Sequence, residues 1–333
     1  MIAKKKLIAL LLLLAGLTLT ALLPLVVSNY MLRVIDMMLI TYVCVLSLFV
    51  IFGMTGQMSF AQAGYWGLGA YITAILTTRF HVEPIVALLA SAVGTGLFVI
   101  FVGMALFRLH GHYFGFATIG VVMTLNGIFQ NWTPVTGGAN GIGSIPPFGI
   151  GGWHITSDFG YFYLLLFFAV AISLVTEWIH RSALGRSFMA IRDNEIAAKC
   201  MGVNSYFTKN VAYVISGVYC GIAGSLFAFL SSYTSATSFV FPQSVLYLVM
   251  LMLGGYNSLL GPIIGTILLI MLPEWFRPLQ EYILLVYGIG VILLMVVMPD
   301  GLIGGGKKLY ACVVRKKCHQ PDDFDKSADN GIG

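Results

Sequence analysis

The side chains best suited to metal binding or covalent catalysis in this chain are its six histidines and five cysteines. The cysteines form no C-x-x-C pair, and the histidines form neither an H-E-x-x-H motif nor another close ligand set. Zinc sites and disulfide frameworks need such spacings or an even set of cysteines. No serine occupies a G-x-S-x-G nucleophile elbow. The sequence therefore predicts no catalytic residue, no metal ligand and no enzymatic activity.

One glycine-rich segment resembles a nucleotide site. Gly301 to Lys308 reads GLIGGGKK and fits the first part of the phosphate-binding pattern G-x-x-x-x-G-K-[ST]. Lys308 stands where Ser or Thr should hold magnesium, and an apolar run precedes the segment in place of a soluble strand. We interpret these glycines as the end of a membrane span beside a basic anchor. ATP and magnesium are therefore expected on partner subunits, and no cofactor is expected on this chain.

The elements that position these residues must lie in lipid. Of 333 residues, 59% are hydrophobic and only 9% are charged, and the mean hydropathy is +0.92. A soluble domain carries about 25% charged residues. This chain has too few charged residues to cover the surface of a protein folded in water. The composition therefore predicts an integral membrane protein.

Ten apolar runs predict the membrane spans. The run at 262–275 is short and the segment 54–70 is rich in glycine, so both are candidates for broken or re-entrant spans. The fold class expected is an all-α integral membrane protein, a polytopic bundle of about ten transmembrane helices. The runs lie at 7–27, 35–53, 60–78, 84–107, 113–131, 161–179, 210–230, 244–260, 262–275 and 283–298.

The distribution of basic residues predicts an orientation. With the N-terminus inside, all of the 18 basic residues except Arg33, Arg79 and Arg277 fall on the cytoplasmic side. Because cytoplasmic loops carry an excess of Lys and Arg, this sorting favours an even number of spans with both termini inside. We expect a permease domain over 1–305 and a cytoplasmic tail over 306–333, basic at first and then disordered.

Two loops outside the membrane are substantial. Residues 132–160 form an external Gly/Pro loop with almost no charge, and residues 180–209 form a basic internal loop. Within the internal loop, Asp193 or Asn194 can cap a short helix that has Glu195 in its first turn and ends at Gly202. Its apolar residues would form a small surface suited to a partner's groove, or would lie on the anionic inner leaflet.

Ionisable residues within spans normally indicate function. In this assignment Asp36, Glu177 and Glu274 lie near span ends, and the span centres hold no carboxylate, Lys or Arg. This pattern counts against a proton- or sodium-coupled carrier. A passive channel would also lack such groups, but it would not need the internal helix.

The segment 56–69 combines glycines with hydroxyl and amide side chains and has no charge. Exposed backbone at membrane depth is tolerated where it is buried in protein or lines a wet cavity. The segment therefore suits a path for a neutral or zwitterionic solute, or close helix packing. For the pairs Gly217-x-x-x-Gly221 and Gly261-x-x-x-Gly265 we expect packing.

Six motifs and the internal loop together resemble the ABC-importer permeases of the branched-chain amino-acid family, and most closely its M-type permeases. The resemblance covers about residues 33–305. It rests on GQMSFAQAGYWGLGAY at 56–71, YFGFATIG at 113–120, TGGANGI at 136–142, GRSFMAIRDNEIAAKCMGV at 185–203, MLGGYNSLLGPIIG at 252–265, PEWFR at 273–277 and PDGLIG at 299–304.

The resemblance implies roles for three sets of residues. Those expected to couple to the ATPase are Gly185, Arg186, Arg192, Asp193, Asn194, Glu195, Ala198 and Gly202. Those expected on the translocation path are Gln57, Ser59, Gln62, Gly64, Gly69 and Tyr71. Those expected to meet a binding protein are Thr136, Gly137, Gly138 and Asn140.

The resemblance also implies an assembly in a bacterial inner membrane. The expected partners are a second permease, two cytoplasmic ATP-binding subunits and a periplasmic solute-binding protein, and no nucleic acid. The family often has Leu in place of Phe60 and Gly in place of Gln62 and Ala63. These departures leave two substrate classes open: the branched-chain amino acids, and urea or short-chain amides.

Overall fold

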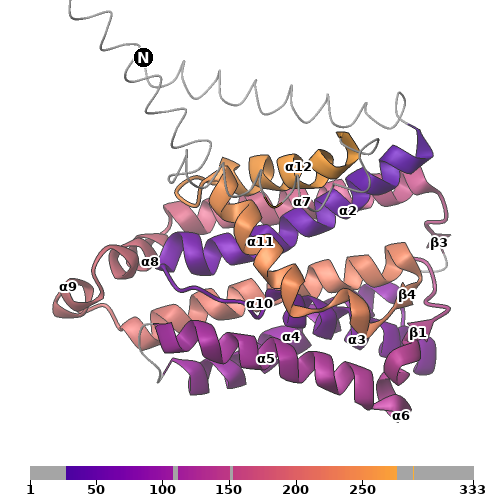
Figure 1. The fold of residues 1–333 in the computed structure, drawn as a ribbon, viewed down its shortest axis with the longest axis horizontal. Coiled ribbons are helices and arrows are strands. Elements are labelled where there is room, and N and C mark those ends of the chain that lie inside the picture. The colour runs from indigo at the N-terminus through magenta and orange to yellow at the C-terminus, as the bar shows by residue number, and fades with distance from the viewer. Residues whose placement is uncertain (1–27, 108–111, 151–152, 276–287, 289–333) are drawn as a thin grey trace, which may run out of the picture.

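A computed structural model describes residues 28–107, 112–150, 153–275 and 288. Most of the long helices run nearly along one axis, with α8 (Ala183–Asp193) and α9 (Glu195–Cys200) at one end and the short strands at the other (Figure 1). The long helices are α2 (Asn29–Leu48), α3 (Gln62–Arg79), α4 (Pro84–Leu106), α5 (His112–Asn131), α7 (Asp158–Arg181), α10 (Ser205–Ser231), α11 (Phe241–Gly254) and α12 (Leu260–Trp275).

Every expected span that falls within the described residues corresponds to a helix, although the one expected at 244–260 ends earlier, at Gly254. Six of the described helical segments are long and apolar enough to cross a membrane, so the chain is an all-α multi-pass membrane protein. Helix α3 and the shorter α12 are not among the six, the expected spans 7–27 and 283–298 lie outside the described residues, and the count of ten is not confirmed. The six are Asn29–Gly53, Pro84–Leu106, Tyr113–Asn131, Asp158–Arg181, Ser205–Ser231 and Ala236–Gly254.

Local sequence explains where several helices begin. The side chains of Ser28, Ser157 and Asn204 accept hydrogen bonds from backbone amides in the first turns of α2, α7 and α10. Helices α4 and α11 instead begin with a proline in the first turn, where its missing amide costs nothing.

Helix α2 begins earlier than the apolar run predicted, and this changes the position of Asp36. The Ser28 cap starts the helix at Asn29, so Asp36 lies about 10 Å inside it at 1.5 Å per residue. Its carboxyl group is fully buried, and neither oxygen has a hydrogen-bond partner. Asp36 is therefore a buried carboxyl group within the first third of the segment Asn29–Gly53, and this weakens the sequence argument against ion coupling.

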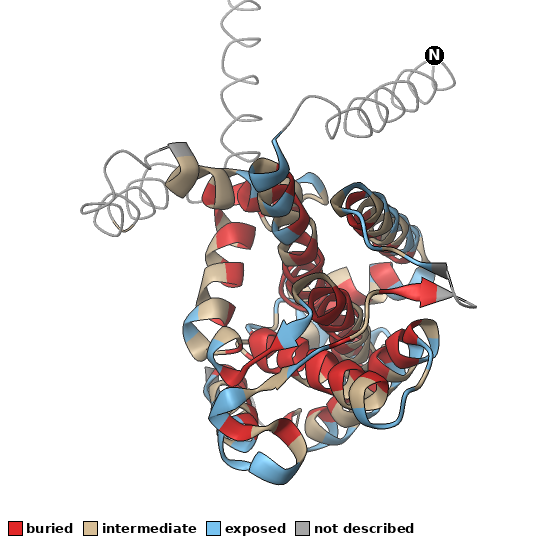
Figure 2. Cartoon of the chain, turned by 90° about the vertical axis from the view of Figure 1, so that its right-hand side faces the viewer, coloured by how far each residue is buried: buried red, intermediate tan, exposed pale blue. Residues whose placement is uncertain are grey.

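Helix α10 lies at the centre of the core, packed against α3 and α4 (Figure 1). Seen from the end of the bundle, buried residues face inward and exposed residues lie on the outer faces (Figure 2). The Tyr65 hydroxyl of α3 and the Tyr213 hydroxyl of α10 lie 2.6 Å apart in a hydrogen bond. Trp66 packs edge-on against Phe239, with ring centroids 4.8 Å apart.

The expected packing glycines are confirmed. A Cβ on Gly217 would lie 2.5 Å from Cγ2 of Val99 on α4. A Cβ on Gly265 of α12 would overlap the backbone carbonyl of Met250 on α11. The absence of side chains at such positions lets backbones approach closely, which drives helix association in lipid.

The outer face of α4 remains apolar. Its exposed side chains recur at helical spacing, so they form one continuous stripe. A stripe of this kind fits contact with lipid hydrocarbon, because no polar group interrupts it. The residues are Val86, Leu89, Val93, Leu97, Phe101 and Met104.

The segment predicted as an external loop is folded at the end opposite α9 (Figure 1). It contains α6 (Thr133–Thr136), η3 (Gly138–Asn140) and three short strands: β1 (Ile142–Gly143), β2 (Gly149–Ile150) and β3 (Trp153–His154). Strand β1 pairs antiparallel with β4 (Tyr233–Thr234) beyond α10, and β2 pairs with β3. A short helix, η4 (Ala236–Ser238), then leads into α11.

Candidate transport and docking site

Helix α2 ends in an irregular segment within the bundle. Its last turn is a π-helix, η2 (Phe49–Gly53), and the chain then runs without regular structure over 56–61 before α3 begins. Gly56 has a φ of +73°, which favours glycine. Single π-turns are frequent at functional sites. The irregular stretch 56–61 confirms the expectation of a broken segment within 54–70.

Side chains of two neighbouring helices accept hydrogen bonds from one amide of this segment and from one amide in the first turn of α3. Thr118 of α5 accepts from the amide of Phe60 at 3.0 Å, and Ser244 of α11 accepts from the amide of Ala63 at 3.0 Å. The break is therefore held by hydroxyl groups, which meets the requirement that backbone polar groups at membrane depth find internal partners.

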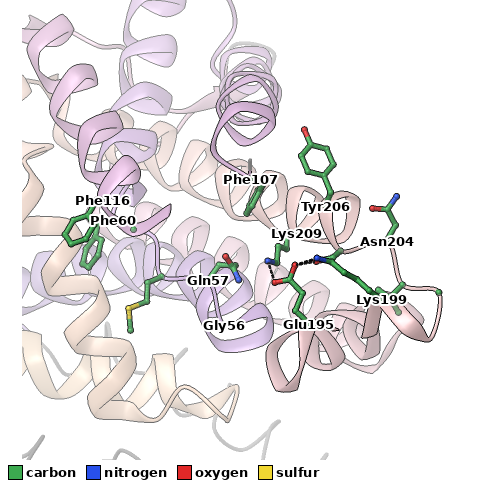
Figure 3. Close-up of a pocket in the computed structure, with 15 residues that line it drawn as sticks. Gly56, Gln57, Phe60, Phe107, Phe116, Glu195, Lys199, Asn204, Tyr206 and Lys209 are labelled. Carbon is green, nitrogen blue, oxygen red and sulfur yellow. Dashed lines mark hydrogen bonds and ion pairs between the residues drawn. The ribbon is translucent and has the colours of Figure 1, made fainter. Parts of the chain in front are cut away.

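A cavity of ≈ 1350 Å³ opens beside the break, at the end of the bundle that carries α8 and α9. Figure 3 shows Glu195, Lys199 and Lys209 at one wall and Gln57 close by. The cavity combines polar, charged and aromatic groups. It is lined by Gly56, Gln57, Met58, Phe60, Phe107, Gly115, Phe116, Glu195, Lys199, Gly202, Val203, Asn204, Ser205, Tyr206 and Lys209.

Of the six residues expected on a solute path, Gln57 is the one that lines this cavity. Ser59 is buried, and its hydroxyl accepts from the amide of Ala61 at 3.4 Å. Gln62 is also buried, and its side-chain amide donates to Ser216 Oγ at 3.4 Å.

The other three expected path residues pack helices together. A Cβ on Gly64 would lie 3.2 Å from Cα of Val122 on α5, and one on Gly69 would lie 2.6 Å from the carbonyl oxygen of Gly221. Tyr71 stacks on Phe129 with ring centroids 4.5 Å apart. In this conformation these residues lie in the packed core.

The internal loop contains two helices where the sequence predicted one. Helix α8 ends at Asp193, and Asn194 caps α9 by accepting from the amides of Ile196 and Ala197, each at 3.0 Å. Gly202 has a φ of +84° and follows the end of α9. The capped short helix and its glycine stop are therefore confirmed. Helix α8 was missed, although its Ser182 cap was readable from the sequence.

The exposed apolar surface of α9 differs from the expected one. Ile196 is 76% exposed and Met201, just beyond the helix, is 85% exposed. Ala198 is only 4% exposed and faces the rest of the chain. Ala198 therefore does not belong to the exposed surface predicted for α9, because its side of the helix packs inward.

Glu195 fixes α9 to the start of α10. Its carboxylate accepts from Ser205 Oγ at 2.6 Å and from Lys209 Nζ at 2.6 Å, and Lys199 Nζ lies 3.0 Å away. Burial raises the pKa of Glu195, but the hydrogen bonds from Lys209, Ser205 and Lys199 outweigh it and lower the pKa from 4.5 to about 2. Ser205 and Lys209 were not predicted as partners, since only the fold brings them to Glu195.

This carboxylate should make the position of α9 sensitive to acid. Because its pKa is lower in the folded chain, its stabilising effect is full above about pH 4.5 and is lost as the pH falls toward 2. A spin label on the exposed Cys200, with Cys312 and Cys318 replaced by serine, should become mobile over that range. Glu195→Gln should give the mobile spectrum at neutral pH too. An immobile label in that variant would contradict the anchoring role.

Three further residues expected to couple occupy different environments. Gly185 is buried where α8 crosses the end of α7, and a Cβ there would overlap the backbone of Ile179 and His180. Arg186 is exposed. Arg192 turns inward and donates to the carbonyl oxygen of Gly53 at 2.6 Å.

The residues expected to meet a binding protein are partly structural. Thr136 is buried, and its hydroxyl donates to the carbonyl oxygen of Phe129 at 2.8 Å. Gly137 and Gly138 have positive φ angles, and Gly138 is buried. Asn140 is exposed at the surface of this end, and its carbonyl oxygen accepts from Tyr233 at 2.9 Å.

Within the described residues, no three His, Cys, Asp or Glu side chains gather to hold a metal ion. The glycine-rich segment 301–308 lies outside those residues. The features that remain are membrane-spanning helices, a glycine-rich break beside a cavity, and a projecting pair of helices. They define a polytopic α-helical membrane protein with a cavity at one end of its helix bundle.

Comparison with known proteins assigns the family. A family model described as the permease component of branched-chain amino acid transport systems matches residues 30–298, so the chain belongs to this family. It is 32% identical to the high-affinity branched-chain amino acid transport system permease protein LivM of Escherichia coli (strain K12). That similarity covers 84% of this chain and 71% of the relative.

Two further relatives are similar. LivM of Salmonella typhimurium is 31% identical over the same shares of the two chains. The autoinducer 2 import system permease protein LsrC of Klebsiella pneumoniae is 29% identical over 40% of each chain. No solved structure matches.

Proposed function

We propose that this chain is a membrane-spanning permease subunit of an ATP-binding cassette importer that carries leucine, isoleucine and valine across the bacterial inner membrane. The match to the permease family over residues 30–298 carries the proposal. The similarity to two LivM proteins supports the substrate class.

The proposed mechanism is alternating access. A periplasmic binding protein delivers solute to the end that holds residues 136–140, where Asn140 is exposed. Two cytoplasmic ATPases bind ATP and magnesium, close, and push α9 through its exposed Ile196 and Met201. A second permease completes the path, and the cavity beside Gln57 is the part of the exit that this chain supplies.

The polar break suits a neutral or zwitterionic solute. Gln57 lines the cavity from an irregular segment, and Phe60 and Phe116 supply apolar surface for a branched side chain. Urea or short-chain amides remain the alternative substrate class. The similarity to an autoinducer 2 permease indicates that related chains serve more than one class of solute.

The first experiment is purification of the tagged chain from its native membrane in mild detergent. We expect an ATP-binding subunit and a second permease to co-purify. Recovery of the chain alone, under conditions that keep a known importer intact, would favour a passive channel or an ion-coupled carrier. Asp36 gives the carrier a residue to test, because its buried carboxyl group has no hydrogen-bond partner.

Uptake then decides the substrate. Cells lacking this chain should lose uptake of radiolabelled leucine and regain it when the chain is restored. Radiolabelled urea serves as the comparison. If those cells lose urea uptake and keep leucine uptake, the substrate class is urea or short-chain amides, and the chain is still a permease.

A further inference from the structure

Arg192, at the C-terminal end of α8, connects three parts of the chain that are distant in sequence. One of its terminal nitrogens, Nη1, donates to the carbonyl oxygen of Gly53 at 2.6 Å and to Oδ1 of Asn257 at 3.0 Å. Its Nε lies 3.5 Å from a carboxylate oxygen of the neighbouring Asp193. The side chain is 27% exposed, so most of it is enclosed by the chain itself.

Both acceptors lie where regular structure ends. Gly53 is the last residue of the π-helix η2, three residues before the irregular segment 56–61 beside the cavity. Asn257 lies in the turn that joins α11 to α12. Arg192 therefore links the α8–α9 segment (residues 183–200) to the end of the α2–η2 helix and to the α11–α12 turn.

The backbone beside the arginine stem leaves room for it. A Cβ on Gly56 would lie 3.1 Å from Cγ of Arg192, so the arginine stem rests against a residue without a side chain. Gly56 lines the cavity together with its neighbour Gln57. A displacement of Arg192 would therefore reach the cavity wall through direct contact.

The chemistry of the side chain suits this link. Arginine is always charged and carries five donors in a rigid plane, so it can hold two acceptors from different segments. A bond to a charged donor is stronger than one between neutral groups. Lysine carries a point charge on a flexible stem and has no second donor nitrogen to replace Nε, which faces Asp193.

We propose that Arg192 is the positioning residue that transmits movement of α8 and α9 to the end of α2 and to the α11–α12 turn. It acts inside this chain and makes no contact with the ATPase. This separates Arg192 from Arg186, which is exposed on the same helix. The inference rests on the proposed function, because a docked ATPase must supply the movement.

The test measures how accessible position 57 in the cavity wall is to a reagent, so its result does not depend on the substrate. Gln57→Cys is introduced into a chain whose Cys200, Cys312 and Cys318 are replaced by serine, and the complex is purified with its ATPase. The rate at which a soluble thiol reagent modifies Cys at position 57 is measured with and without ATP. In the parent complex, ATP should change that rate.

Arg192→Gln should reduce this ATP-dependent change about tenfold, in the range of ordinary coupling between sites, while the ATPase still co-purifies. Arg192→Lys should show nearly the same reduction in the ATP-dependent change as Arg192→Gln. Arg181→Gln is the matched control, because it removes the same charge from an exposed pair with Glu177 and should leave the change intact. Asn257→Ala removes one acceptor and should give an intermediate loss.

Three results would overturn the proposal. Arg192→Gln could respond to ATP as the parent does. It could lose the ATPase while Arg181→Gln keeps it, which would make Arg192 a docking contact. Both Arg192→Gln and Asn257→Ala could fail to fold, which would make the link a static support. A parent complex that contains no ATPase would instead refute the proposed function.

Discussion

Ile196→Glu should abolish solute uptake while the chain still reaches the membrane in normal amount. Ile196 is 76% exposed on α9 and makes no contribution to the core, so its replacement leaves the fold intact. In the proposed complex it enters an apolar groove of the ATPase, where an unpaired carboxylate costs several kcal/mol. Because each 1.4 kcal/mol or so weakens binding about tenfold, ATPase co-purification should fall by at least about tenfold.

The matched control adds the same charge to the same segment at another place. Ala183 is exposed at the first position of α8, where a carboxylate is favourable to the helix dipole. Ala183→Glu should therefore retain uptake and ATPase binding. Equal uptake in the Ile196 and Ala183 variants would refute docking through α9. Ala198→Glu cannot serve as this test, since Ala198 is buried and its variant would disturb folding.

Gly224→Val should prevent α3 and α10 from packing and so remove most folded protein from the membrane. A Cβ at Gly224 would overlap the carbonyl oxygen of Trp66 and lie 2.6 Å from the amide nitrogen of Ala70. Both atoms belong to the α3 backbone, so no side chain can rotate away. Overpacking of this kind costs about 1–3 kcal/mol or more, and valine adds its branched bulk.

Membrane level and thermal stability in detergent measure this effect. Gly120→Ala is the control, because a Cβ at Gly120 of α5 would meet nothing within 4 Å. That variant should keep or slightly raise the thermal stability, since alanine favours a helix over glycine by about 1 kcal/mol. Normal folded protein from Gly224→Val would mean that the two helices can separate at little cost.

Much of the architecture follows from the sequence alone. The apolar composition required lipid as the solvent, and each apolar run within the described residues became a helix because a backbone in lipid must satisfy its own hydrogen bonds. Asn194 and Gly202 marked the ends of α9 for equally local reasons, a side-chain cap and a left-handed backbone. The motifs also predicted the family that the comparisons then assigned.

Contacts between segments that are distant in sequence could not be predicted from the sequence. The partners of Arg192 lie 139 and 65 residues away, and no local pattern indicates Gly53 or Asn257 as acceptors. The same limit applies to Gly69 and Gly224. Their tight contacts depend on which faces of α3 and α10 meet, whereas Gly217 and Gly221 could be read from a motif.

The composition, the helices, their caps and the family were determined by the sequence, because each depends on chemistry within a few residues or on the solvent that the whole chain requires. Tertiary structure decided which side chains are buried and which polar groups meet: it buried Asp36 and Ala198, placed Gln57 on the cavity, and turned Arg192 inward. The physical reason is that burial and hydrogen bonding across helices depend on rotation and register, and these are fixed only when the whole bundle packs.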